Sequence, residues 1–409
     1  MTTELRPLRD ADWDAWYDKL DVAFGGIPDG PERRAWWRAI TEVERAFAVR
    51  DGDEIVGTGG SFSFGLTVPG GAELAVAGVT LISVQPTHRR RGVLRSMMRH
   101  QLTDVHERGE ALAVLTATEP AIYGRFGYGP ATQELRMTVD TLRLAAPDLP
   151  GVDDVRLRLV DPAAALEECE RVYARLVPTR PGMLARRPHW GRGGVLDPEG
   201  ERNGAGALQC VLAEVDGEVR GYARYAVKPE WDHTGPRGTV LVRHIDALDP
   251  VAYAALWRYL FGIDLTASVA VRGRPVDDPL LHLVADQRRC DIGVRESLFV
   301  RPVDVGAALA ARTYQAPVDV VLEVADDFCP WNAGRWRLSG DAKGASCERT
   351  TDPAELALSV RELGSAYLGG FTLSALAGAG RVRELRTGAL AAASVAFGSD
   401  AAPWLPHGF

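Results

Sequence analysis

The feature that most constrains the fold is an apolar, β-branched stretch that runs into a basic turn. Residues 74–84 read LAVAGVTLISV, a pattern typical of a buried strand. After a short turn the chain presents Arg89–Gly92, and helical spacing of apolar residues then continues to about residue 108. A further strand is indicated at 111–116. A strand, a helix and a second strand in this order predict an α/β domain with a mixed sheet flanked by helices.

The basic turn predicts an anion site at the beginning of that helix. The first N–H groups of a helix have no intrahelical partners, and the macrodipole adds roughly half a positive charge there. Gly92 has no Cβ, which lets a diphosphate approach the backbone, and Arg89 and Arg90 can donate charge-assisted hydrogen bonds. On charge alone, a solvated basic helix start is the alternative. The strand before the turn and the glycine inside it favour the anion site.

Composition narrows the class of protein. The chain has 409 residues, enough for two to three domains, and its net charge of −8 argues against nucleic acid as a partner. No apolar run approaches the roughly 20 residues that span a bilayer. The sequence begins MTTELRPLRD, which lacks the apolar core of a signal peptide. We therefore expect a cytoplasmic protein without a membrane partner.

The cysteines and histidines give no metal-binding pattern. The five cysteines are scattered without a CxxC spacing, which argues against a zinc knuckle and favours reduced, structural thiols. His100 and His106 stand six residues apart on the expected helix and do not share a face. We expect no metal cofactor.

Turn-rich boundaries divide the chain into three parts. The segment 147–154 ends the first part, and the second repeats the strand–helix–strand order at 239–271. From about residue 296, strands and Ala-rich helices alternate in a different way. We predict domains at 1–150, 151–297 and 298–409. Further helices are expected near 32–45 and at 361–379 and 388–397.

The basic turn belongs to a longer pattern that resembles a known family. Val84, Pro86, Arg89, Gly92 and Leu94 match the V-x-P-x-x-R-x-x-G-x-L pyrophosphate motif of GNAT acetyltransferases. The string PTHRRRGVLR, followed by IYGRFGYGPAT, resembles the Eis acetyltransferases, and similar strings continue through the whole chain. The resemblance implies a GNAT domain, a degenerate second GNAT-like domain, and a C-terminal domain like sterol carrier proteins.

The resemblance implies that acetyl-CoA is the co-substrate. Ile82 and Val84 would offer backbone groups to the pantetheine arm and the acetyl carbonyl, and Thr118 would lie where the next strand opens toward the thioester. The residues that would hold the diphosphate are Arg89, Arg90, Gly92 and Val93.

The resemblance also assigns the proton transfers. Tyr123 would be the general acid, and Phe409 would supply the general base through its terminal carboxylate. A carboxylate suits an amine whose pKa lies near 10, and a phenol with a pKa of about 10 can protonate the departing thiolate. Tyr128 is a rival for Tyr123. Termini are often frayed, but the aromatic and proline residues of 403–409 favour docking into a pocket.

The acceptor pocket is less defined. Phe24 and Trp36 are expected wall residues, with helix-core packing as the alternative. Aminoglycoside-modifying relatives carry an acid just before the terminal residue, where this chain has Gly408. Asp21 and Asp29 are near in sequence, but their direction is not readable. Fewer acids would weaken the attraction of polycations, so an aminoglycoside, a polyamine and a peptide amine all stay open as acceptors.

Two other functional classes compete with catalysis. The C-terminal domain also fits a lipid-binding protein, and the anion site fits an acetyl-CoA sensor. A retained Arg89–Gly92 turn and a retained Tyr123 favour the enzyme. On resemblance alone, we expect a homo-oligomer, a hexamer.

Overall fold

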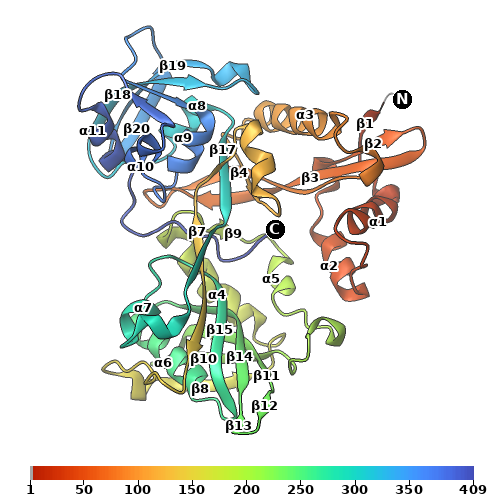
Figure 1. Ribbon diagram of the computed structural model, residues 1–409, viewed down its shortest axis with the longest axis vertical. Coiled ribbons are helices and arrows are strands. Elements are labelled where there is room, and N and C mark those ends of the chain that lie inside the picture. The colour runs from red at the N-terminus through yellow and green to blue at the C-terminus, as the bar shows by residue number, and fades with distance from the viewer. Residues whose placement is uncertain (1–2) are drawn as a thin grey trace. The chain divides into compact units, whose positions relative to one another are not determined.

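A computed structural model describes residues 3–409 (Figure 1). The chain forms two compact units, which are treated separately below. The first unit comprises residues 1–133, 180–185 and 296–409, and the second comprises 134–179 and 186–295. Within residues 3–409, no helix combines the length and apolarity that a membrane span requires.

The first unit is built on an eight-stranded sheet with the order β1-β2-β3-β4-β5-β17-β6, in which β9 also pairs with β3. Its strands are β1 (Glu4–Pro7), β2 (Ala46–Asp51), β3 (Glu54–Thr67), β4 (Glu73–Val84), β5 (Leu112–Thr116), β6 (Gly129–Pro130), β9 (Leu184–Ala185) and β17 (Leu298–Pro302). The helices that cover it are α1 (Trp13–Ala23), α2 (Pro31–Ile40) and α3 (Val93–Glu107). The predicted strand–turn–helix–strand order is thus present.

Alternation along β2 separates the two faces of this sheet. Ala46 and Ala48 pack in the cluster of α1, with Trp16 and Tyr17. Phe47 and Val49 point the other way and pack in a cluster with Met97 of α3 and with Val56. Since successive strand residues face opposite sides, α1 and α3 cover opposite faces (Figure 1).

The helix expected near 32–45 ends earlier, at Ile40. Thr41 has an extended backbone, and the following residues turn so that Arg45 enters the core. There its guanidinium makes two hydrogen bonds of 2.8 and 2.6 Å to the carboxylate of Glu110. A continuous helix would carry Arg45 away from that buried partner.

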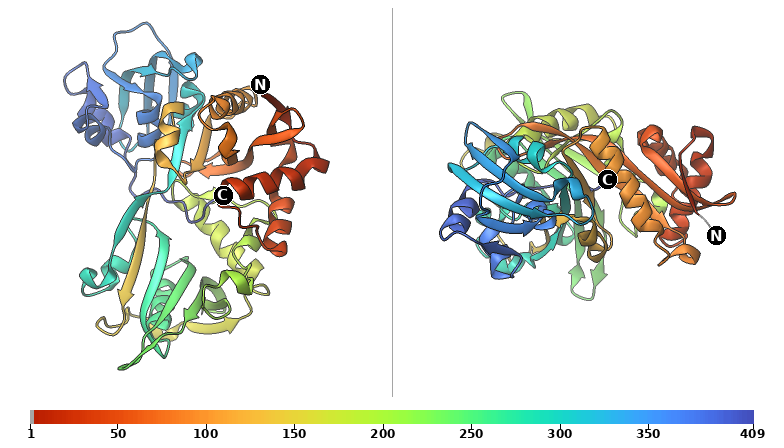
Figure 2. Two further views of the ribbon diagram at one scale, coloured as in Figure 1. Left: turned by 45° about the vertical axis from the view of Figure 1, so that its right-hand side comes forward. Right: turned by 90° about the horizontal axis from the view of Figure 1, so that it is seen from above.

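The C-terminal part of the first unit contains a five-stranded sheet with the order β20-β19-β18-β21-β22. Its strands are β18 (Val318–Ala325), β19 (Gly334–Asp341), β20 (Gly344–Arg349), β21 (Leu356–Ser359) and β22 (Val382–Glu384). Its helices are α8 (Val305–Ala310), α9 (Val360–Ala366), α10 (Leu373–Gly378) and α11 (Ala389–Ala396). In both views of Figure 2 the chain end lies against the orange N-terminal part and not beside the blue sheet.

The helix expected at 361–379 is interrupted. The chain leaves the helix after α9, where buried Arg312 donates a hydrogen bond to the carbonyl of Tyr367. Thr372 then caps a new helix by accepting a hydrogen bond from the backbone N–H of Ala375 at 3.1 Å. A carbonyl partner and an N-cap at these positions explain the two short helices.

The second unit is a seven-stranded sheet with the order β16-β7-β15-β14-β11-β10-β8. Its strands are β7 (Gln133–Asp140), β8 (Arg156–Val160), β10 (Gln209–Val215), β11 (Glu218–Lys228), β14 (Gly238–Ala247), β15 (Thr266–Arg274) and β16 (Gly293–Glu296), beside the two-stranded ribbon of β12 (Trp231–Asp232) and β13 (Gly235–Pro236). Its helices are α4 (Leu166–Leu176), α5 (Trp190–Gly193), α6 (Pro250–Phe261) and α7 (Leu280–Leu283). The segment β14–α6–β15 repeats the order of β4–α3–β5.

Side chains of the chain itself bond to the backbone at the start of α6 and near the end of β14. Asp249 caps α6, its carboxylate accepting from the N–H of Ala252 at 2.9 Å. Arg274 donates to the carbonyl of Ile245 at 2.7 Å and pairs with Asp278 at 2.7 Å, both side chains being buried. These contacts differ from those at the start of α3, where the helix begins at Gly92 with open space around it. A degenerate second GNAT-like domain stays a prediction.

Two strands near the predicted domain limits pair in the sheet of the adjoining part of the chain. β7 belongs to the sheet of the second unit, and β17 joins the sheet of the first. The limits 1–150, 151–297 and 298–409 themselves stay predictions.

Candidate active site

A cavity lies between the ends of β4 and β5. These parallel strands pair over Val76–Gly78 and Leu112–Val114. Beyond that, Leu115 and Thr116 of β5 pair with β17, while β4 continues to Val84 along β3. The last residues of β4 thus extend past their ladder with β5, and their backbone on that side can meet a ligand.

A bulge redirects β4 where it meets the cavity. Gly59 of β3 stands opposite two residues, Leu81 and Ile82, and Leu81 has a φ of 56°. Thr58 holds the bulge by donating its hydroxyl to the carbonyl of Leu81 at 2.8 Å. A left-handed non-glycine residue costs about 1–3 kcal/mol, and bulges of this kind re-aim residues beside active sites. Here consecutive residues of β4, not alternate ones, line the cavity.

The basic turn presents an open, positively charged helix start. Arg89 and Arg90 are exposed, and Arg89 also donates its Nε to the carbonyl of Val84 at 3.3 Å. Gly92 has a φ of 85°, which favours glycine, and no atom of the described chain lies within 4 Å of where its Cβ would be. Val93 is buried, so only its backbone N–H is available to an anion. The predicted diphosphate residues therefore lie together at this end of α3.

His88 fixes this turn to the sheet. Its ring is buried, with Nε2 3.2 Å from a carboxylate oxygen of Asp51 and Nδ1 2.8 Å from the hydroxyl of Thr87. These contacts anchor the turn that leads to α3.

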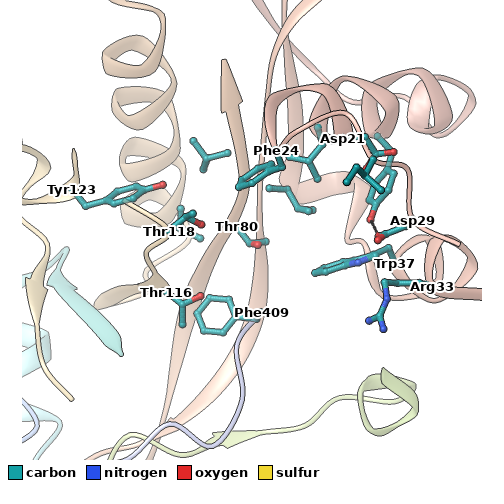
Figure 3. A pocket seen from close by; sticks show the side chains of 16 residues that line it. Asp21, Phe24, Asp29, Arg33, Trp37, Thr80, Thr116, Thr118, Tyr123 and Phe409 are labelled. Atoms are coloured by element: carbon teal, nitrogen blue, oxygen red, sulfur yellow. Dashed lines mark hydrogen bonds between the residues drawn. The ribbon is translucent and has the colours of Figure 1, made fainter. Parts of the chain in front are cut away.

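The cavity has a volume of about 440 Å³ (Figure 3). Five of the residues predicted for the site line it: Phe24, Ile82, Thr118, Tyr123 and Phe409. From α2 the lining side chains among the described residues are Arg33 and Trp37, not Trp36. The other lining residues are Tyr17, Leu20, Asp21, Ile27, Asp29, Val79, Thr80, Leu81 and Thr116.

Tyr123 stands on one side of the cavity, on the 3-10 helix Pro120–Phe126 (Figure 3). Burial raises the pKa of its phenol, and Glu119 raises it further. Tyr128 is fully buried in an apolar cluster with Phe126 and is not a lining residue. Of Tyr123 and Tyr128, it is thus Tyr123 that lines the cavity, and its raised pKa keeps the phenol protonated at neutral pH, while the phenol of Tyr17, a further lining residue, donates to Asp29.

The C-terminal tail brings Phe409 to the cavity. Trp404 donates its N–H to the carbonyl of Pro181 at 2.8 Å, and Arg180 donates to the carbonyl of Ala402 at 2.9 Å. At the tip, the ring of Phe409 packs edge-on against Phe64 of β3, with 5.1 Å between centroids. The tail is therefore docked, as its aromatic and proline residues predicted.

Two carboxylates to which the sequence assigned no role, those of Asp21 and Asp29, line the cavity. Asp29 accepts a hydrogen bond of 2.6 Å from the hydroxyl of Tyr17, and Asp21 lies one helical turn beyond Tyr17 on α1. The pKa of Asp21 is raised, first by burial and then by the charge of Asp29. In Figure 3 both lie on the side of the cavity opposite Tyr123. The i, i+4 spacing of Tyr17 and Asp21 was the signal that could have shown that they share a face.

Comparison with known proteins identifies the family. Models of the acetyltransferase (GNAT) domain match residues 4–131 and 182–302, and a sterol carrier protein domain model matches 305–406. The chain is 62% identical over 409 residues, all of both chains, to an uncharacterized N-acetyltransferase of Streptomyces avermitilis. It is 36% identical to the N-acetyltransferase Eis of Mycobacterium tuberculosis, over 98% of each chain. The crystal structure of Eis1 from Mycobacterium abscessus superposes with a TM-score of 0.85 and 35% identity over the whole of both chains.

These similarities confirm the predicted fold of tandem GNAT domains followed by a sterol-carrier-like domain. GNAT enzymes transfer the acetyl group of acetyl-CoA to an amine, and the cleft beside β4 with the open start of α3 fits this donor. Within residues 3–409, no group of three or more acidic, histidine or cysteine side chains is arranged to hold a metal ion. The chain is an acetyltransferase and belongs to the Eis family of N-acetyltransferases.

Proposed function

We propose that the protein acetylates a primary amine by direct attack, with Tyr123 as general acid and the Phe409 carboxylate as general base. The observation that carries the proposal is that both residues line one cavity with Ile82 and Thr118, at the open end of β4. Tyr123 and Phe409 come from distant parts of the chain. Their meeting beside the splayed strands supports a role in one reaction.

The terminal carboxylate serves the attacking amine. An alkyl amine with a pKa near 10.4 is mostly protonated at pH 7 and must lose a proton before or during attack. A carboxylate within reach, directly or through one water molecule, accepts that proton. The docking of the tail through Trp404 supports this role for the carboxylate.

Tyr123 serves the leaving group. The amine adds to the thioester carbonyl and gives a tetrahedral oxyanion. When this intermediate collapses, the carbon–sulfur bond breaks and its electron pair stays on sulfur. The phenol of Tyr123 donates its proton to this sulfur, which yields the CoA thiol and a phenolate that regains a proton from water. Backbone N–H groups at the β4 bulge stabilise the oxyanion formed during attack.

The donor binds along β4 and at the start of α3. Backbone groups of Ile82 and Val84 hold the pantetheine arm, and Thr118 lies beside the thioester. The diphosphate meets the N–H groups of Gly92 and Val93 together with the exposed guanidinium groups.

The acceptor extends from the reaction centre toward the acid pair. Asp21 and Asp29 favour an acceptor with a second cationic group, and the walls from Phe24 and Trp37 favour an apolar segment between the two ends. Polyamines satisfy both conditions, and aminoglycosides satisfy the first. A peptide lysine, whose side chain carries a single amine, satisfies the second and stays open as an acceptor. We further propose that the protein is cytoplasmic. By resemblance we also propose that it forms a hexamer, and light scattering of the purified protein would measure its oligomeric state.

A CoA-release assay with a panel of amines tests the proposal. Purified protein, acetyl-CoA and each amine are mixed, free thiol is followed, and the product is identified by mass spectrometry. Turnover with formation of an N-acetyl product is expected for at least one diamine. Acetyl-CoA binding without turnover for any amine would favour a sensor. Lipid binding without acetyl-CoA affinity would favour a carrier.

A further inference from the structure

The segment that carries Tyr123 is a short 3-10 helix. Its internal hydrogen bonds include Gly127 N–H to the Gly124 carbonyl at 3.1 Å, and Tyr128 N–H reaches the Tyr123 carbonyl at 3.4 Å. Hydrogen bonds of 3-10 helices have poorer geometry than those of α-helices, and such segments stay short. The direction of the Tyr123 side chain therefore depends on what packs against this segment.

Arg301 of β17 holds the end of that helix. Its guanidinium is fully buried and donates Nε to the carbonyl of Phe126 at 3.2 Å. It also donates to both carboxylate oxygens of Asp326, at 2.9 and 2.7 Å. Asp326 immediately follows β18, so this ion pair joins the Tyr123 segment to the C-terminal sheet.

The carboxylate of Asp326 is itself held by the loop that follows. It accepts hydrogen bonds from the N–H of Cys329 at 2.9 Å and from Nδ2 of Asn332 at 3.0 Å. A buried ion pair whose remaining lone pairs are satisfied is rigid, because every rotation would leave a charge unpaired. The guanidinium is thus a fixed point for the Phe126 carbonyl.

Two further contacts link the C-terminal domain to the same segment. Phe328 packs edge-on against Phe126, with 5.1 Å between ring centroids. Arg361 of α9 lies so close to Gly124 that a Cβ there would stand 2.9 Å from the guanidinium carbon. Gly124 and Phe126, which both follow Tyr123 in this helix, therefore rest on side chains of the C-terminal domain.

We propose that the C-terminal domain positions Tyr123 for proton transfer through the Arg301–Asp326 ion pair, which makes Arg301 and Asp326 positioning residues. The inference rests on the proposed role of Tyr123 as general acid. It gives the sterol-carrier-like domain a task in the reaction besides delivering the terminal carboxylate. Arg301 does not touch the substrates and acts through the Phe126 carbonyl.

The test compares this pair with a matched pair elsewhere. Arg301→Lys keeps the charge but has one nitrogen, which cannot replace both Nε on the Phe126 carbonyl and Nη2 on Asp326, and Asp326→Asn keeps the shape but loses the charge. Arg274→Lys and Asp278→Asn are the controls, because that pair is equally buried and belongs to the other compact unit. Each full-length variant is measured for kcat, for acetyl-CoA Kd by calorimetry, and for amide hydrogen exchange of the peptide 120–128. Tyr123 is titrated by difference spectra against the same variant carrying Tyr123→Phe.

The Arg301 and Asp326 variants are expected to lose at least tenfold in kcat while the acetyl-CoA Kd changes less than twofold. Exchange at 120–128 is expected to quicken, and the pKa of Tyr123 to fall toward its ordinary value as water reaches the phenol. The control variants are expected to change neither. If all four variants lose thermal stability alike, with kcat, exchange and the Tyr123 titration unchanged, the pair is structural only and the inference is wrong.

Failure of the proposed function gives a different result. An inactive wild-type protein, or an unaffected Tyr123→Phe variant, would overturn the acid role. The exchange and titration measurements would still report whether Arg301 and Asp326 hold the segment.

Discussion

Trp404 and Pro181 are joined by a backbone hydrogen bond of 2.8 Å, which attaches the last residues of the chain to the segment before β9. Gly182, with a φ of 93°, lies against this bond, since a Cβ there would meet the Trp404 backbone at 2.9 Å. β9 pairs with β3 of the first sheet. Main-chain contacts thus hold the segment that leads to Phe409, whose ring packs against Phe64 of the same strand.

Blocking the Phe409 carboxylate is expected to abolish turnover. A Phe409 amide, made by ligation, keeps the docked ring and removes the charge. If the carboxylate is the base, kcat falls by about 10²–10⁴-fold, while acetyl-CoA Kd is unchanged. Deletion of Phe409 and an extension of two residues are expected to act alike. The same extension placed at the N-terminus is the control, and wild-type turnover by the amide would contradict the base role.

Tyr123→Phe is expected to lower kcat by about 10²–10⁴-fold without changing acetyl-CoA binding. Tyr128→Phe is the matched control, since its phenol is fully buried and away from the cavity. The acid form of Tyr123 is needed, and its pKa is raised above 10, so activity is lost only as the pH rises through that higher value. A kcat profile with a descending limb from Tyr123 below pH 9 would contradict this assignment.

Local signals predicted the donor side, while long-range contacts decided the acceptor side. The β-branched run of β4, Pro86 and Gly92 of the turn, and the period of α3 are all short-range patterns. Trp36 and Trp37 are neighbours on α2 and point about 100° apart, so only packing decides which one lines the cavity. Trp37 is stacked with Phe62 of β3, at 6.4 Å between centroids.

No periodicity in the sequence predicts that Tyr123 and Phe409 line the same cavity. Composition and spacing show only that the tail is suited to docking, and the resemblance alone joined the two residues. The acid pair was missed for a related reason. The direction of Asp29 depends on the loop after α1 and on its hydrogen bond to Tyr17, which no local pattern encodes.

Gly92→Ala is expected to weaken acetyl-CoA binding and to lower stability by about 1–2 kcal/mol, because an alanine resists a φ of 85°. Gly109→Ala is the control, since Gly109 follows α3 with a φ of 74° and equally open space around its Cβ position. Both variants are expected to unfold at a lower temperature, and only Gly92→Ala to raise the KM for acetyl-CoA. Equal KM values for the two variants would argue against a diphosphate at the start of α3.

Asp21→Asn is expected to lower the selectivity among acceptors and to raise stability at neutral pH. Burial and the charge of Asp29 raise the pKa of Asp21 in the folded protein. Stability from such a group is fully present below the unfolded pKa of about 3.9 and is lost as the pH rises through the raised value. The substitution therefore raises the Tm at pH 7, and this advantage disappears as the pH falls toward 4. Asp53→Asn, which removes a carboxylate at an exposed turn outside the cavity, is the control.

The same Asp21 variant distinguishes acceptors by their second charge. If the acid pair binds a distal ammonium group, kcat/KM for a diamine falls roughly tenfold, about 1.4 kcal/mol of binding free energy. For a monoamine of equal length, kcat/KM is expected to change less than twofold, because the monoamine has no second ammonium group to reach Asp21. Steady-state kinetics with both amines on the wild-type protein and on Asp21→Asn and Asp29→Asn measures the difference. Equal losses for the monoamine and the diamine would mean that the two carboxylates shape the cavity and do not select its occupant.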